Sequence, residues 1–336
     1  YANCLFAISK TEDPDIKLAI SLLEEAKEAQ LIDSYAYTNT LVAISKSKLA
    51  HTDLIFQLIA DAKNAQLIDT IVYACALDAL AHTADADYTK ILHLFEEAKQ
   101  QDMVNQITYS SMLNLLAQSS KPNLDYGLQL FQEVKAAKYL DSHIYSDLIH
   151  VIAKSKPVDL ELALSVFDDA VTQKYIDTVI YANTMLAIQN TSPVQSHLAF
   201  ELYQKAQNAN LTNTILANNA IKVLLLAPQP NFSHIQSILQ DCIDKSQIDS
   251  MLLQQFYNLM IQNHHFALPL LRIIFTHGHH TPASPFYALF QQPEWMAYIK
   301  QHTLLQSSLP WLNYIDTTQP TTSTHTVVPE TTMIMA

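Results

Sequence analysis

The sequence predicts an all-α fold, a right-handed superhelical solenoid of about seven helix-turn-helix repeats of 36 residues with a helical C-terminal cap. An Asp or Asn returns at this interval from Asp33 to Asp249, and a Tyr does so from Tyr1 to Tyr181. Recurrence at such a period is typical of stacked helical repeats. The 336 residues include only two glycines, which disfavours hairpin-rich sheets and phosphate-cradling loops.

The first half of each unit predicts a helix that begins near the tyrosine. Apolar residues follow the tyrosine by four and seven positions, as in Tyr37, Leu41 and Ile44, and this spacing places them on one helical face. We therefore expect the tyrosines to pack in the core.

The second half predicts an amphipathic helix, as in LQLFQEVKAA at 128–137. Its acidic column, which includes Glu25, Asp61 and Glu97, has lysines two residues on and is interpreted as a solvated outer face. Polar turns separate the helices, and several contain proline, where it interrupts no helix. Because a single helical hairpin cannot bury its apolar face, the units must stack.

Three segments are expected. Repeats fill residues 1–249, a helical capping region fills 250–315, and residues 316–336 form a disordered tail rich in Thr and Pro.

Composition disfavours several classes of function. The three cysteines form no CxxC pair, so we expect a reducing compartment and no structural zinc site. No run of eighteen apolar residues occurs, so no membrane span is expected. The histidines at 262–280 lack nearby Cys or carboxylate, so no metal site and no cofactor are predicted. Nothing resembles a nucleophile with its base, and no enzyme activity is expected.

Residues 1–249 resemble the pentatricopeptide repeat family. The segment YTNTLVAISK matches the family's first helix, and LFEEAK at 94–99 and LFQEVK at 130–135 match its second. The units depart from the family in their length of 36 rather than 35 residues and in lacking the usual glycine and proline before the closing Asp. The resemblance implies binding of single-stranded RNA, one base per repeat, in a mitochondrion or another organelle, as part of RNA metabolism, translation or a ribonucleoprotein.

The resemblance also assigns site residues. The residue after each tyrosine and the closing Asp or Asn would read the base, which gives the pairs Ala2 with Asp33, Thr38 with Asp69, Ala74 with Asn105, Ser110 with Asp141, Ser146 with Asp177, Ala182 with Asn213, and Asn218 with Asp249. The residue two before each tyrosine would stack on the base, which gives Tyr35, Ile71, Ile107, His143 and Val179. Lys10, Lys46 and Lys154 match the family's phosphate-facing lysine.

By the family's base preferences these pairs predict a purine-rich strand, roughly GGAGGAU from 5′ to 3′. The pairs that contain alanine specify their base poorly, because alanine offers no hydrogen bond. A register shifted by one would instead use Asn3, Asn39, Cys75, Ser111, Asp147 and Asn183. The first register is preferred because it places both tyrosine and lysine where the family has them.

Other interpretations of the same columns remain open. An Asp or Asn before a helix is an ordinary N-cap, and capping is compatible with base reading. The lysines can solvate helix ends instead of phosphates. The net charge of −13 opposes phosphate binding, but the first helices are nearly free of acids. The alternative function is a protein-interaction scaffold or a subunit of a larger assembly that uses the same solenoid surface.

Overall fold

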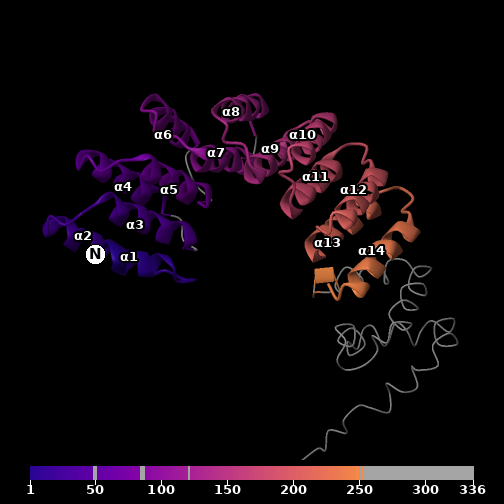
Figure 1. Cartoon of the computed structure of the whole chain (residues 1–336), viewed down its shortest axis with the longest axis horizontal. Coiled ribbons are helices and arrows are strands. Elements are labelled where there is room, and N and C mark those ends of the chain that lie inside the picture. The colour runs from indigo at the N-terminus through magenta and orange to yellow at the C-terminus, as the bar shows by residue number, and fades with distance from the viewer. Residues whose placement is uncertain (48–50, 84–87, 120–121, 248, 250, 253–336) are drawn as a thin grey trace, which may run out of the picture. The chain divides into compact units, whose positions relative to one another are not determined.

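A computed structural model describes residues 1–252 except 48–50, 84–87, 120–121, 248 and 250 (Figure 1). The chain divides into two units, Tyr1–Gln247 and Ile248–Ala336. The described residues belong almost entirely to the first unit. The predicted tail at 316–336, the histidines at 262–280 and nearly all of the predicted cap at 250–315 lie outside them.

The described part of the chain contains fourteen α-helices and no strand, which confirms the predicted all-α repeat fold. The helices are α1 (Ala2–Ser9), α2 (Ile16–Glu28), α3 (Ser34–Lys46), α4 (Thr52–Asn64), α5 (Thr70–Ala81), α6 (Tyr88–Gln100), α7 (Gln106–Gln118), α8 (Leu124–Ala137), α9 (Ser142–Lys154), α10 (Leu160–Thr172), α11 (Thr178–Asn190), α12 (Ser196–Asn208), α13 (Thr214–Leu225) and α14 (Phe232–Asp244). Each repeat is one odd-numbered helix followed by one even-numbered helix.

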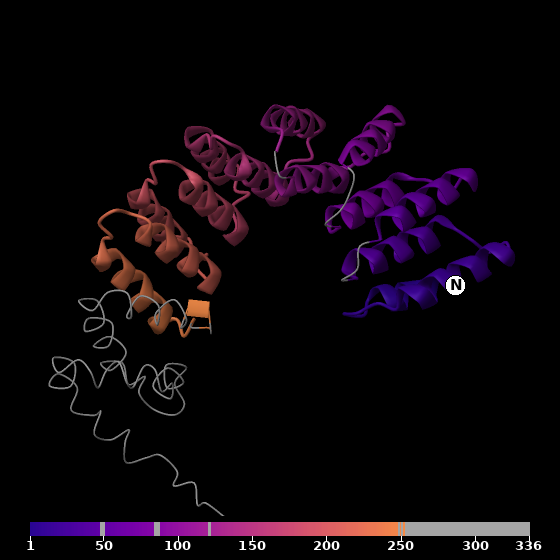
Figure 2. The ribbon, with the colours of Figure 1, turned by 180° about the vertical axis from the view of Figure 1, so that it is seen from behind.

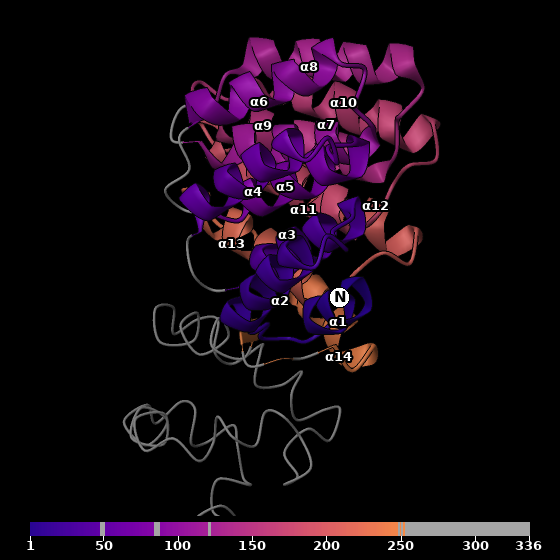
Figure 3. The same cartoon turned by 90° about the vertical axis from the view of Figure 1, so that its left-hand side faces the viewer.

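The helices of the first unit form two rows. Each odd-numbered helix packs against the next odd-numbered one, and each even-numbered helix packs on the odd-numbered helices of its own repeat and of the next repeat where one follows. Figures 1 and 2 show the odd-numbered helices on the inner side of the curved stack, and Figure 3 shows α6, α8 and α10 along its outer edge. We call these the inner row and the outer row.

The tyrosine column from Tyr37 to Tyr181 lies in the core between the rows, as predicted, whereas Tyr1 is 40% exposed. Tyr37, Tyr73 and Tyr145 are at most 1% exposed. In three repeats a phenylalanine of the preceding outer helix meets the tyrosine edge to face, as in Phe131 and Tyr145, whose ring centroids lie 5.4 Å apart. Such pairs add to the stabilisation by burial, so these three tyrosines join their repeats to the ones before.

The Asp and Asn column caps the inner helices, which confirms the capping interpretation. The Oδ1 atom of each member accepts a hydrogen bond from a backbone N–H two or three residues on, in all seven repeats, at Asp33, Asp69, Asn105, Asp141, Asp177, Asn213 and Asp249. This bond satisfies one of the orphan donors of a helix N-terminus. The second polar atom of each side chain takes no part in the cap.

The outer helices end on a left-handed residue where the resemblance would lead one to expect glycine. Seven non-glycine residues at the 36-residue interval have φ between 54° and 64°, namely Gln30, Gln66, Asp102, Lys138, Lys174, Asn210 and Ser246. The next N–H bonds back to a carbonyl five residues earlier, as from Leu31 to Ala26 at 2.9 Å. This geometry is a Schellman ending, which glycine adopts without strain.

The interpretation of the acidic column as a solvated face holds for Glu25, which is exposed, and is wrong from Asp61 to Asp169. Lys63 Nζ lies 2.6 Å from Glu97 of the next repeat, and the Tyr73 hydroxyl donates to the same carboxylate at 3.1 Å. Equivalent lysine–carboxylate pairs join α2 to α4, α6 to α8 and α8 to α10. These side chains are drawn into the seam between repeats because a lysine of the preceding outer helix pairs with each of these carboxylates. At Glu97, Glu133 and Asp169 a tyrosine hydroxyl from the inner helix of the same repeat donates to the carboxylate as well. We call this series the outer ladder.

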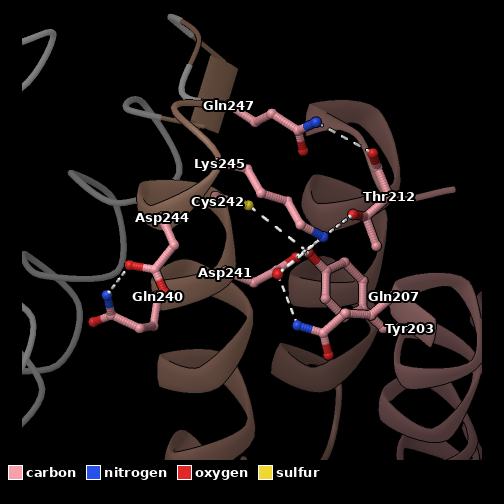
Figure 4. A network of polar contacts seen from close by, with 9 residues as sticks. All are labelled: Tyr203, Gln207, Thr212, Gln240, Asp241, Cys242, Asp244, Lys245 and Gln247. Atoms are coloured by element: carbon pink, nitrogen blue, oxygen red, sulfur yellow. Dashed lines mark hydrogen bonds and ion pairs between the residues drawn. The ribbon is translucent and has the colours of Figure 1, made fainter. Parts of the chain in front are cut away.

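The seam between α12 and α14 differs, because the lysine that pairs with its carboxylate comes from the same helix end and the contacts between repeats come from other side chains (Figure 4). Asp241 accepts hydrogen bonds from the Tyr203 hydroxyl at 2.8 Å and from Gln207 Nε2 at 2.7 Å. Lys245 Nζ lies 3.0 Å from Asp241 and donates to Thr212 Oγ1 at 2.7 Å. Burial raises the pKa of the Asp241 carboxyl, but these donors outweigh it and hold that pKa below its usual value.

No helix in the described ranges has the length and apolar character needed to cross a membrane.

Candidate functional site

The inner row carries a column of exposed apolar side chains. Tyr35, Ile71, Ile107 and Val179 are 50–64% exposed, although apolar residues on neighbouring positions of the same helices are buried. His143 continues the column and is also exposed. These are the five predicted stacking residues, and each stands at the start of its inner helix, next to the capping Asp or Asn. Ile215 at the start of α13 continues the column and was missed by the sequence analysis, because the tyrosine that marks the register is replaced there by Ala217.

The predicted base-reading residues occupy the same edge of the inner row, with different degrees of exposure. Ala2, Thr38, Ser110 and Ala182 are half-buried, and Ala74, Ser146 and Asn218 are buried. The partners Asp33, Asp69, Asn105, Asp141, Asp177, Asn213 and Asp249 are all half-buried. Asn218 has no hydrogen bond to any described residue through its side-chain amide. The six reading pairs that lie wholly in the first unit thus share an edge, but they do not form identical pockets.

One cavity brings the two predicted kinds of residue together. A space of about 400 Å³ on the inner row is lined by the reading pair of the fourth repeat, Ser110 and Asp141, and by the two stacking residues on either side, Ile107 and His143. Asp141 caps α9 through Oδ1, and its Oδ2 accepts a hydrogen bond from Gln106. An apolar wall on one side, an imidazole on the other and polar groups between them can hold a planar polar ring.

The floor of this cavity contains acidic groups. Asp78 of α5 and Asp147 of α9 also line it. Burial raises the pKa of Asp147 to about 6, although the Ser110 hydroxyl donates to its Oδ2 at 2.5 Å and His143 also favours its charged form. Burial likewise raises the pKa of Asp78, against the opposing effect of His82. Carboxylates here accept hydrogen bonds and repel phosphate, so the cavity suits the donor edge of a neutral ring.

The three lysines predicted to face phosphates make different contacts. Lys46 donates to the Ser9 carbonyl oxygen of the preceding inner helix at 2.7 Å. Lys10 Nζ lies 4.9 Å from the centroid of the Phe6 ring. Lys154 is exposed at the end of α9. Asn190 stands in the same column and donates to the Ala153 carbonyl oxygen at 2.8 Å. This column therefore links helix ends between repeats, at least at Lys46 and Asn190.

The residues of the shifted register face the preceding repeat. Asn39 Nδ2 donates to the Ala2 carbonyl oxygen at 3.3 Å, Asp147 accepts from Ser110, and Asn183 Nδ2 donates to Ser146 Oγ at 2.9 Å. Each contact reaches the residue at the first reading position of the previous repeat. Both registers contribute to the cavity of the fourth repeat, the preferred one through Ser110 and Asp141 and the shifted one through Ser111 and Asp147. The cavity therefore does not decide between the two registers.

No cluster of His, Cys, Asp and Glu in the described residues has the arrangement of a metal site.

No protein-family model matches the chain, and no curated protein matches it by sequence. Two solved structures resemble it in fold. One is the pentatricopeptide repeat protein PPR10 in complex with an 18-nt psaJ RNA element, and the other is a triple cysteine-to-serine variant of PPR10 with the same RNA element. Each is 14% identical, with a TM-score of 0.50, and the match covers 88% of this chain and 43% of that one. The fold is therefore a pentatricopeptide-like solenoid, and the chain spans less than half the length of PPR10.

Proposed function

We propose that the protein binds single-stranded RNA along the edge of the inner row, one base per repeat. The observation that carries the proposal is the cavity of the fourth repeat, where Ile107, Ser110, Asp141 and His143 meet in one space. Those four residues come from three predicted columns, the stacking residue, the residue after the tyrosine and the closing Asp or Asn. The RNA complexes of PPR10, which has the same fold, add support.

The physical basis of binding is stacking together with hydrogen bonds to the base edge. Exposed apolar side chains in a row cost free energy in water and recover it when they cover the faces of unpaired bases. Double-stranded RNA does not expose its base faces, so the column favours single strands. By the reading pairs, the preferred strand is purine-rich, close to GGAGGAU.

Phosphate contacts contribute less than in most RNA-binding proteins. The net charge is −13, and Lys46 is already bonded to a carbonyl oxygen. We therefore expect a shallow dependence of affinity on salt, with about three to five phosphate contacts. A role in organellar RNA metabolism or translation is proposed on the family resemblance alone.

The test is fluorescence anisotropy with labelled GGAGGAU and its complement AUCCUCC, at about 50 and 150 mM salt. The proposal expects tighter binding of the purine strand and a loss of affinity in Ser110→Ala. Lys17→Ala, at an exposed position of outer helix α2, is the matched control and should bind as the wild type does. Absence of binding to either strand at low salt would overturn the proposal.

A scaffold function has one observation in its favour. A cavity of about 460 Å³ lies on the outer row between α4 and α6, lined by Phe56, Ile59 and Leu94 among others. Apolar grooves between helices are common docking sites for peptides. If RNA does not bind, a pull-down with the wild type and with Ala60→Asp, at an exposed position that lines this cavity, is the next experiment, and partners lost in the variant would support this second function.

A further inference from the structure

Two serines at equivalent positions of neighbouring repeats have opposite hydrogen-bonding roles. Ser110 on α7 donates its hydroxyl proton to Asp147 Oδ2 at 2.5 Å, since an ionised carboxylate can only accept. Ser146 on α9 accepts at Oγ from Asn183 Nδ2 at 2.9 Å. In both cases the partner lies 37 residues further on, in the next inner helix.

The orientation of the Asn183 amide is fixed by a second bond. The same Nδ2 lies 3.0 Å from the Ser146 carbonyl oxygen, which is an acceptor, so this end of the amide must be the nitrogen. Among the described residues no hydrogen bond uses the Ser146 hydroxyl as donor. The Ser146 side chain is 5% exposed, and its hydroxyl proton is not engaged by any described residue, whereas the proton of Ser110 is engaged and only its lone pairs are available.

We propose that Asp147 and Asn183 determine base specificity by setting the hydrogen-bond polarity of the reading serine in the repeat before them. This inference rests on the proposed RNA-binding function. Ser110, held as an acceptor, and the Asp141 carboxylate together present two acceptors to a base. Ser146, held as a donor, and the Asp177 carboxylate present one donor and one acceptor.

These two patterns fit different base edges. Guanine offers two adjacent donors, N1–H and the N2 amino group, which match two acceptors. Adenine offers one donor, the N6 amino group, beside an acceptor, N1. At the fourth repeat the adenine N1 would face a serine lone pair, so guanine is selected. At the fifth repeat either purine finds a matching pair, because guanine can also use O6 and N1–H.

The two repeats thus differ in specificity although their reading pairs are the same residues, Ser with Asp. A site built to hydrogen-bond a base discriminates when the wrong base leaves a buried group unpaired. For one unmatched hydrogen bond we expect a preference for guanine over adenine on the order of tenfold at the fourth position. At the fifth position we expect a ratio near one.

The test compares three RNAs, GGAGGAU, GGAAGAU and GGAGAAU, which place adenine at the fourth or fifth position. Binding is measured with the wild type and with the reciprocal variants Asp147→Asn and Asn183→Asp. Asp147→Asn should reduce the preference for guanine at the fourth position to a ratio near one. Asn183→Asp should create such a preference at the fifth position.

Asn39→Asp is the matched control. Asn39 occupies the same position but contacts the repeat that has Ala2, which has no hydroxyl to orient, so base preference should not change. Circular dichroism establishes that each variant folds, and if one does not, the wild-type ratios at the two positions carry the test. Equal ratios at both positions in the wild type, or ratios unmoved by the swaps while binding persists, would overturn this inference alone. Absence of binding to any of the three RNAs would overturn the proposed function with it.

Discussion

The outer and inner seams between repeats are built on different plans. The outer ladder repeats one contact from α2 to α10, a lysine of one outer helix on the carboxylate of the next, in the pairs Lys27 with Asp61, Lys63 with Glu97, Lys99 with Glu133 and Lys135 with Asp169. The inner seam changes at each step, with an Asn bonded to a backbone carbonyl at one junction and an Asp bonded to a serine at another. A contact that only holds repeats together can be uniform, whereas contacts behind the proposed reading residues can vary from repeat to repeat if each repeat reads a different base.

The largest difference in stability should appear between substitutions of two tyrosines of the inner row, the buried Tyr145 and the exposed Tyr35. Tyr145→Ala removes a fully buried ring and should lower the free energy of unfolding by about 3–5 kcal/mol. Tyr35→Ala, at a position 64% exposed, should change stability by less than about 0.5 kcal/mol. The same Tyr35 variant should weaken RNA binding by about fivefold or more through lost stacking. Urea unfolding and anisotropy check both parts, and an equal loss of stability in the two variants would remove the distinction between the buried tyrosine column and the exposed column of the inner row.

The next largest effect is the pH dependence of stability that Asp147 causes in the cavity of the fourth repeat. Because burial raises the pKa of Asp147 to about 6, the folded protein binds this proton more tightly than the unfolded chain does. Stability should therefore fall as pH rises from about 4 to 6, and it stays lower above that range. His143 and Asp141, which face the carboxyl from α9 and its cap, act in opposite directions.

Asp147→Asn tests this directly. The variant should be more stable than the wild type by about 2 kcal/mol at pH 7.5, and this gain should shrink at pH 4.5. Urea unfolding at the two pH values gives the comparison. Asp13→Asn, at an exposed turn, should show no such difference. A variant less stable than the wild type at pH 7.5 would mean that the ionised carboxylate is favourable in its site.

A smaller effect is expected in the outer ladder. Glu97→Gln removes the partner of Lys63 and weakens the bond from Tyr73, and because these side chains are about one quarter to one third exposed, the loss should be about 1 kcal/mol. Burial raises the pKa of Glu97, but the contacts with Lys63 and Tyr73 lower it by more, so the pKa lies below its usual value. The stabilisation is therefore present at neutral pH and is lost as pH falls below about 4.5. Thermal unfolding at pH 7 and pH 3.5 should show the difference only at pH 7. Glu25→Gln, an exposed member of the same column, is the control.

The smallest change in stability should come from the left-handed residue that follows each outer helix. Lys174 has φ of 64°, a conformation that glycine adopts without strain, so Lys174→Gly should raise stability by about 0.5–1 kcal/mol. Asn210→Gly should gain less, because Asn tolerates the left-handed region. Equal gains, or a loss in Lys174→Gly, would show that the side chain itself makes a stabilising contact.

The repeat architecture could be predicted from the sequence because each column has one dominant physical role. The tyrosines repeat at a fixed helical spacing and are buried, and the Asp and Asn residues precede helices and cap them. Such roles are local, or follow from periodicity, and need no knowledge of the neighbouring repeat.

The inter-repeat contacts could not be predicted in the same way. Lys63 and Glu97 are 34 residues apart, and only the angle between successive repeats decides whether such charges face solvent or each other. The role of Asp147 was missed for the same reason, because its partner Ser110 lies 37 residues earlier on another helix. Ile215 was missed because the tyrosine that marks each register is absent from its repeat.

The most direct test of the central claim, one base per repeat along the inner row, is positional photocrosslinking. GGAGGAU-type RNAs that carry a photoreactive base at successive positions are irradiated with the wild type, and the crosslinked peptides are mapped by mass spectrometry. The account predicts that the crosslinks move by one 36-residue repeat for each nucleotide, along the odd-numbered helices from α1 to α13. Crosslinks that fall on the outer helices, or that stay in one place as the photoreactive base moves, would contradict it.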